Sequence, residues 1–64
     1  MLEFCKKILV KVSFDRHLFA KELRKSVTWI SDPSELQKLR EWCIGHYGAQ
    51  YGDLIQRAFS PVLA

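Results

Sequence analysis

The amino-acid sequence predicts an all-α protein, a small bundle of four short helices in one domain spanning residues 1–64. Apolar residues recur at spacings of three and four, which places them on one face of a helix. The segment SDPSE combines the signals that begin a helix. No segment alternates apolar and polar residues convincingly enough for a sheet. The expected helices cover residues 2–12, 14–30, 33–47 and 50–59.

The first of these segments fits a helix and a strand nearly equally well. On a helix, one face would carry Leu2, Cys5, Ile8, Leu9 and Val12. On a strand, the alternating apolar positions would be Ile8, Val10, Val12 and Phe14. A single strand leaves its backbone N–H and C=O groups unpaired, so we expect a helix. A strand over residues 8–14, paired between two chains, remains the alternative.

The second helix is expected to begin at a capping residue, Ser13 or Asp15, because a short side-chain oxygen can accept the first free N–H groups. Its apolar stripe consists of Phe19, Leu23, Ser26, Val27 and Ile30. Its opposite side is polar and mostly basic. The stripe should therefore face the interior of the bundle, and the basic side should face solvent.

The segment SDPSE marks the start of the third helix. Ser31 or Asp32 can cap it, Pro33 suits the first turn, and Glu35 favours the positive end of the helix dipole. Its expected inner face carries Leu36, Leu39, Cys43, His46 and Tyr47, with Trp42 at the margin. Gly48 is expected to adopt the left-handed conformation that often follows a helix end.

The fourth helix is expected over residues 50–59. Its inner face would carry Tyr51, Leu54, Ile55 and Ala58. Asp53 and Arg57 are spaced to form an ion pair four residues apart. Pro61 is expected to end this helix.

Composition and charge set limits on the class of protein. The apolar fraction of 48% is typical of a globular chain. The longest apolar run is three residues, far short of the roughly 20 that a transmembrane helix needs, so we expect a cytoplasmic protein without a membrane span. The net charge of +3 is unevenly spread, because residues 1–30 carry seven Lys/Arg against three acids.

Cysteine and histidine residues form no recognisable metal or catalytic motif. Zinc sites usually supply ligands as two close pairs, whereas the chain offers one such pair, Cys43 and His46. Cys5 lies on the first helix's apolar stripe, and His17 lies on the polar side of the second helix. No orienting third group or glycine-rich phosphate loop accompanies Cys43. We therefore expect no enzyme activity, no metal and no cofactor.

The basic side of the second helix allows binding to nucleic acid. Its candidate residues are His17, Lys21, Arg24 and Lys25. They could contact phosphates with a salt-dependent affinity that ignores base sequence. A helix-turn-helix is not expected, because the third helix would be the recognition helix and begins with Asp32 and Glu35. Nucleic-acid binding is the alternative function.

Surplus apolar residues favour a protein-interaction role. Five large apolar residues lie outside the expected inner faces of their helices: Phe4, Val10, Leu18, Trp29 and Ile44. A chain this short cannot bury all of them against itself, and exposed apolar groups that cluster mark contacts with other chains. We expect the partner to be another protein or a second copy of this chain.

No named family is indicated by the sequence. The segment FDRHLFAKELRKSVTWI is similar to many short bacterial helical proteins, and that resemblance implies no particular function.

Overall fold

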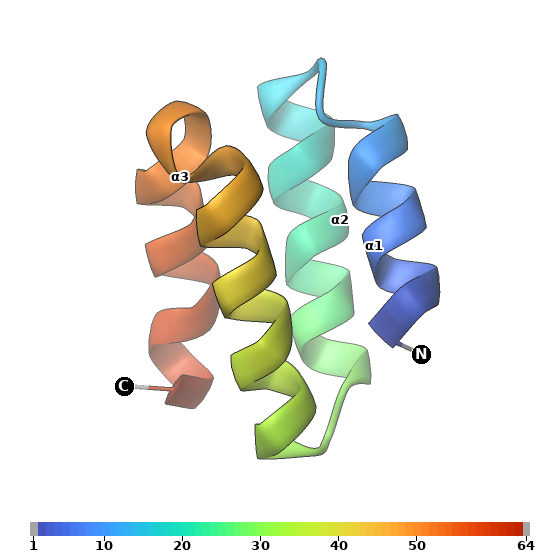
Figure 1. The fold of residues 1–64 in the computed structure, drawn as a ribbon, viewed down its shortest axis with the longest axis vertical. Coiled ribbons are helices and arrows are strands. Elements are labelled where there is room, and N and C mark those ends of the chain that lie inside the picture. The colour runs from blue at the N-terminus through green and yellow to red at the C-terminus, as the bar shows by residue number, and fades with distance from the viewer. Residues whose placement is uncertain (1, 64) are drawn as a thin grey trace.

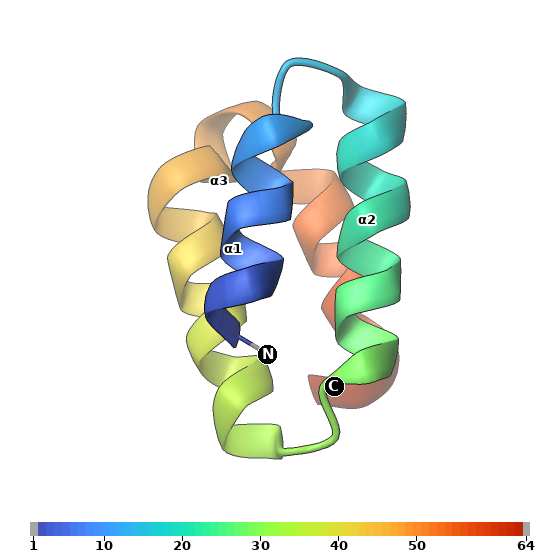
Figure 2. The same cartoon turned by 90° about the vertical axis from the view of Figure 1, so that its right-hand side faces the viewer.

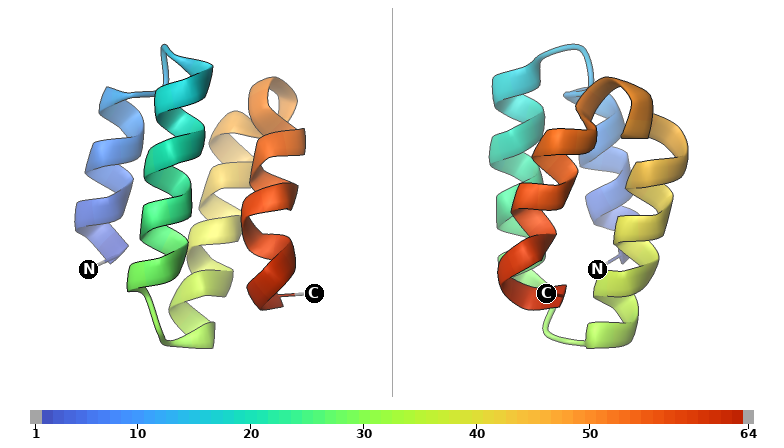
Figure 3. Two further views of the ribbon diagram at one scale, coloured as in Figure 1. Left: turned by 180° about the vertical axis from the view of Figure 1, so that it is seen from behind. Right: turned by 90° about the vertical axis from the view of Figure 1, so that its left-hand side faces the viewer.

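The computed structural model describes residues 2–63, without the side chain of Leu63, and these residues form three helices: α1 (Leu2–Lys11), α2 (Arg16–Trp29) and α3 (Pro33–Leu63). Figure 1 shows α1 rising, α2 descending beside it and α3 rising again before it turns back on itself. Seen from the side, α1 lies in front, with α2 to its right and the first part of α3 to its left (Figure 2). The second part of α3 packs on the far side, away from α1 (Figure 3).

The segment predicted to be either helix or strand is the helix α1. Cys5 and Leu9, one turn apart, are fully buried, while Leu2 and Val12 pack partly against the core. No strand occurs among residues 2–63. The helical prediction for this segment is therefore confirmed, with its end at Lys11 rather than at residue 12.

Local capping chemistry defines the boundaries between the helices. The Asp15 carboxylate accepts hydrogen bonds from the N–H groups of His17 (2.9 Å) and Leu18 (3.2 Å), so Asp15 is the residue that caps α2. Asp32 accepts the Ser34 N–H at 2.9 Å, directly before Pro33 begins α3. Each loop thereby gives the first free N–H groups of the next helix a partner.

The prediction of four helices is wrong, because the segments 33–47 and 50–59 belong to one helix, α3. Gly48, expected to end the third helix in a left-handed conformation, has no positive φ. Within α3 the backbone leaves helical dihedral angles at Tyr51 instead (φ −128°, ψ 28°). The helix also continues past Pro61 to Leu63, since proline's fixed φ is itself helical and only one backbone hydrogen bond is lost there.

Packing of the Tyr51 side chain accounts for the position of this kink. Its ring stacks on Phe19 of α2, with the centroids 4.7 Å apart, and its hydroxyl donates to the carbonyl of Ser13 at 2.6 Å. Nearby, Arg16 at the start of α2 forms an ion pair with Asp53. The expected Asp53–Arg57 pair is replaced by this long-range contact, so residues just after the kink are tied to the beginning of α2.

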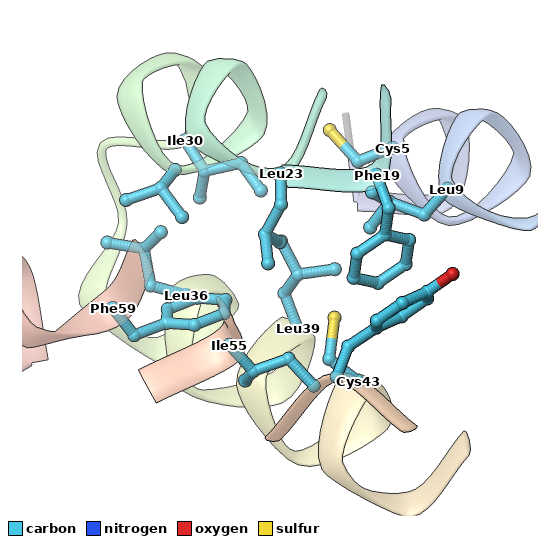
Figure 4. Close-up of a cluster of buried hydrophobic side chains, with 12 residues drawn as sticks. Cys5, Leu9, Phe19, Leu23, Ile30, Leu36, Leu39, Cys43, Ile55 and Phe59 are labelled. Carbon is cyan, nitrogen blue, oxygen red and sulfur yellow. The ribbon is translucent and has the colours of Figure 1, made fainter. Parts of the chain in front are cut away.

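The hydrophobic core lies between all three helices. Its side chains converge from α1, α2 and both parts of α3 (Figure 4). The buried cluster consists of Cys5, Leu9, Phe19, Leu23, Val27, Ile30, Leu36, Leu39, Cys43, Tyr51, Ile55 and Phe59. The predicted stripe of α2 is buried in full, including Ser26, whose hydroxyl donates to the carbonyl of Glu22 at 3.0 Å. Phe59, which the sequence did not single out, is also buried.

Candidate protein-binding surface

The five apolar residues that the sequence nominates for binding all lie on the surface. Their exposed fractions run from 38% for Leu18 to 55% for Phe4, with Val10, Trp29 and Ile44 between them. Large apolar residues at such exposures leave much of their area in contact with water. The structure adds two exposed apolar residues that the sequence did not nominate, Phe14 at 79% and Val62 at 47%.

These five residues do not form one continuous patch. Leu18 and Trp29 lie on the same side of α2, but eleven residues of helix put about 16 Å between them. Between them on that side stand Glu22 and Lys25, whose side chains form an ion pair at 3.5 Å. Polar groups therefore separate the two apolar ends of this face.

The two nominated residues of α1 also point in different directions. Phe4 and Val10 are six residues apart, which leaves about 120° between them around the helix axis. Ile44 lies on α3, beside Gly48, where an added Cβ would meet the Ile44 side chain at 3.4 Å. Val10 lines a hollow among described side chains.

That hollow is a shallow groove between α1 and the first part of α3. It has a volume of about 450 Å³, and its lining is Glu3, Lys6, Lys7, Val10, Lys11 and Trp42. Val10 and the partly buried Trp42 supply its apolar surface. We call it the Trp42 groove. The sequence placed Trp42 at the margin of its helix but gave no sign that Val10 would lie across from it.

Charged side chains crowd the edge of the Trp42 groove. Lys6 Nζ forms an ion pair with Glu3 at 3.3 Å and also lies over the Trp42 ring, 5.8 Å from its centroid. The ring is held from its own helix by His46 and Tyr47, with centroid distances of 5.0 and 5.8 Å. Three lysines against one glutamate give the lining a formal charge of +2.

A second hollow lies between α2 and the second part of α3. It has a volume of about 320 Å³, and its lining is Arg24, Val27, Thr28, Arg57, Ala58, Pro61 and Val62. Arg24 and Arg57 are both exposed and reach it from different helices. Within residues 2–63, no carboxylate lies within ion-pair distance of either guanidinium.

The residues nominated for nucleic-acid binding are also exposed. His17, Lys21, Arg24 and Lys25 all face solvent along α2. Lys25 is paired with Glu22, which reduces the charge available to a phosphate at that position. Trp29, which is 52% exposed, lies one turn after Lys25 on α2, so this row has one exposed aromatic ring beside it.

The cysteine and histidine that stand three residues apart in the sequence have different environments. Cys43 is fully buried and its thiol is free, whereas His46 is exposed. Burial raises the pKa of the Cys43 thiol to about 12, partly opposed by the positive charge of Lys6. Because the thiolate is the nucleophile, burial and the raised pKa both disfavour reaction at Cys43 at neutral pH. His46 was expected on the inner face, but it is exposed, and its ring centroid lies 5.0 Å from that of Trp42.

Cys5, like Cys43, is a buried free thiol within the core. Among the described residues, no group of three or more His, Cys, Asp or Glu side chains is arranged to hold a metal ion.

No helix formed by residues 2–63 has both the length and the apolar character needed to cross a bilayer. Comparisons with protein families, with curated proteins and with solved structures found no match. What the surface can bind must therefore be argued from its own geometry and charge.

Proposed function

We propose that this chain is a small non-catalytic module that binds another protein through its exposed apolar residues. The observation that supports this is that the core is complete without them. All three helices contribute to a closed cluster of buried side chains, and none of Phe4, Val10, Leu18, Trp29 and Ile44 belongs to it. Single exposed apolar residues are normal on a protein surface, so the proposal is supported most by Val10, which shares a hollow with Trp42.

Charge favours a different protein over a second copy as the partner. Four of the five residues lie on α1 and α2, and residues 1–30 carry seven Lys/Arg against three acids, a formal charge of +4. A two-fold dimer places the same patch opposite itself, so these like charges would face each other. The expected partner is therefore an acidic protein.

Affinity capture with a matched variant tests this proposal. The native chain and a variant with all five residues replaced by serine are each used as bait in extracts of the native cell. Each complex that is recovered is then reconstituted from the purified proteins. We expect one or more acidic proteins to bind the native chain and not the variant, with unchanged helicity in circular dichroism. Identical binding to both baits would overturn the proposal.

Sedimentation velocity tests the choice between a partner and self-association. At micromolar concentration and low salt, where like charges repel most strongly, we expect a monomer. A stable dimer under these conditions would contradict the charge argument and show that a second copy covers the apolar residues.

A second candidate function, nucleic-acid binding, is favoured by the exposure of His17, Lys21, Arg24 and Lys25 along one helix. Contacts from such a row to phosphates would give an affinity that falls steeply with salt. Titration of duplex and single-stranded oligonucleotides at two salt concentrations tests it. Binding that weakens with salt and is lost in Lys21→Glu would support this function, and no binding at low salt would remove it.

A further inference from the structure

We propose that the Trp42 groove is the docking site for an acidic segment of the partner protein, one that carries an apolar side chain between its carboxylates. This inference rests on the proposed function and names the chemistry of the partner. It is drawn from a juxtaposition that the fold creates, because Val10 comes from α1 and Trp42 from α3.

The floor of the groove suits an apolar side chain. Val10 is 53% exposed, and the Trp42 ring is partly buried, so both keep apolar area uncovered. The volume of about 450 Å³ lies within the range of about 300–1,000 Å³ that is usual for small binding pockets. A single leucine or phenylalanine of a partner could cover both residues and release the water that contacts them.

The rim of the groove suits carboxylates. Lys6, Lys7 and Lys11 all line it, and Glu3 is the one acid among its lining residues. Lys7 and Lys11 are exposed, and no carboxylate of the described residues lies within ion-pair distance of either ammonium group. Their positive charge would attract an acidic segment and orient its apolar residue toward Val10 and Trp42.

Glu3 acts as an internal competitor for the acidic segment. Its carboxylate is 3.3 Å from Lys6 Nζ, and its side chain is 79% exposed, so a ligand carboxylate can take its place without disturbing the core. Glu3→Gln frees Lys6 and raises the formal charge of the lining from +2 to +3. The variant should therefore bind the acidic segment more tightly than the native chain does.

The same geometry disfavours a nucleobase in the groove. Base stacking needs an open aromatic face, and Lys6 Nζ lies over the Trp42 ring at 5.8 Å from its centroid. A base would have to displace this ammonium group and lose its attraction to the ring. An acidic peptide keeps Lys6 in place and pairs with it.

Fluorescence anisotropy with a labelled peptide tests the proposal. The probe is an amphipathic peptide rich in glutamate with leucines on one helical face, at low and at physiological salt. Lys7→Glu should weaken binding about tenfold at low salt, and Glu3→Gln should strengthen it about twofold to fivefold. Lys21→Glu is the charge-matched control, since both Lys→Glu changes lower the net charge from +3 to +1.

A pair of valine variants tests the apolar floor independently of charge. Val10→Ser should weaken binding about threefold to tenfold, because the apolar contact is lost. Val62→Ser is the matched control, since Val62 is similarly exposed, at 47%, and lies outside the groove. Circular dichroism of each variant checks that the helices are unchanged.

The possible outcomes separate this inference from the proposed function. If Lys7→Glu and Lys21→Glu weaken peptide binding equally, or if Val10→Ser and Val62→Ser do, the Trp42 groove is not the docking site. If the serine variant of the five apolar residues fails to capture acidic proteins while the peptide ignores the groove, the proposed function stands and the inference fails. If a single-stranded oligonucleotide displaces the peptide and binds more tightly at the same salt concentration, the groove is a nucleic-acid site and the proposal is wrong.

Discussion

Tyr51→Phe tests the contact to which we attribute the kink in α3 at Tyr51. The substitution removes one oxygen atom and keeps the ring that stacks on Phe19 at a centroid distance of 4.7 Å. The lost interaction is the 2.6 Å hydrogen bond from the Tyr51 hydroxyl to the Ser13 carbonyl, which joins residues 38 positions apart. The effect therefore isolates a single long-range tie between α3 and the loop after α1.

The expected cost follows from burial at the two ends of this bond. A typical intramolecular hydrogen bond contributes about 0.5–1.5 kcal/mol to the free energy of unfolding. Ser13 is only partly buried, so water can replace the lost donor and the upper penalty for a bare carbonyl does not apply. We expect a loss of about 1 kcal/mol, equivalent to a fall in Tm of about 4–8 °C for a chain of this size.

Urea and thermal unfolding followed by circular dichroism measure this loss. Tyr47→Phe is the matched control, because its ring also packs on Phe19, at 5.1 Å, while its hydroxyl has no hydrogen-bond partner within residues 2–63. Tyr51→Phe should lower the unfolding midpoint clearly more than the control. Equal midpoints for the two variants would refute the claim that this hydrogen bond stabilises the kink in α3.

Three further changes test the core and the titratable groups. Phe59→Ala should cost about 3–5 kcal/mol and leave the helices largely unfolded, whereas Val62→Ser should not, as circular dichroism at room temperature can show. The hydrogen bond from Arg16 lowers the pKa of Asp53, so the stability from this pair is present above pH 3.8 and is lost as the pH falls through the lowered pKa. As the pH falls through the acid range, the urea midpoint of Asp53→Asn should therefore fall less than that of the native chain. The Cys43 thiol, with its pKa raised to about 12, should react with Ellman's reagent at pH 8 only after unfolding, and fast reaction of the native chain would contradict its burial.

Local sequence signals were enough to predict α2 and the start of α3, whereas the segment of α1 fitted a strand nearly as well as a helix. The spacing of Phe19, Leu23 and Ile30 determines which side of α2 is buried, because those positions lie on one face at 100° per residue. Asp15 caps α2 because its carboxylate accepts hydrogen bonds from the N–H groups of His17 and Leu18. Such features depend on residues within one or two turns, so they can be read from a single sequence.

The region after residue 48 could not be predicted in the same way. Glycine commonly ends a helix, and Gly48 was expected to do so. The backbone leaves helical angles at Tyr51 instead, where contacts with the distant Phe19 and Ser13 stabilise the kink. Asp53 likewise pairs with Arg16 instead of the residue four positions on. The position of the kink and the partner of Asp53 are determined by tertiary contacts, which the spacing of residues along the chain does not reveal.

The binding surface shows the same limit. Helical spacing identified Val10 and Trp29 as surplus apolar residues, and both are exposed. Which of them would share a hollow with another helix depends on how α1 and α3 pack together. The Trp42 groove therefore depends on how the helices pack, and the sequence alone does not predict it.

Amide chemical shifts recorded by NMR during titration with the acidic peptide test the central claim most directly. We predict that the shifts concentrate on residues 3–11 of α1 and on the residues of α3 next to Trp42, and that they are clearly smaller in Val10→Ser at the same peptide concentration. Shifts running instead along α2 from His17 to Lys25, or no shifts at all, would contradict the claim that this groove receives the partner.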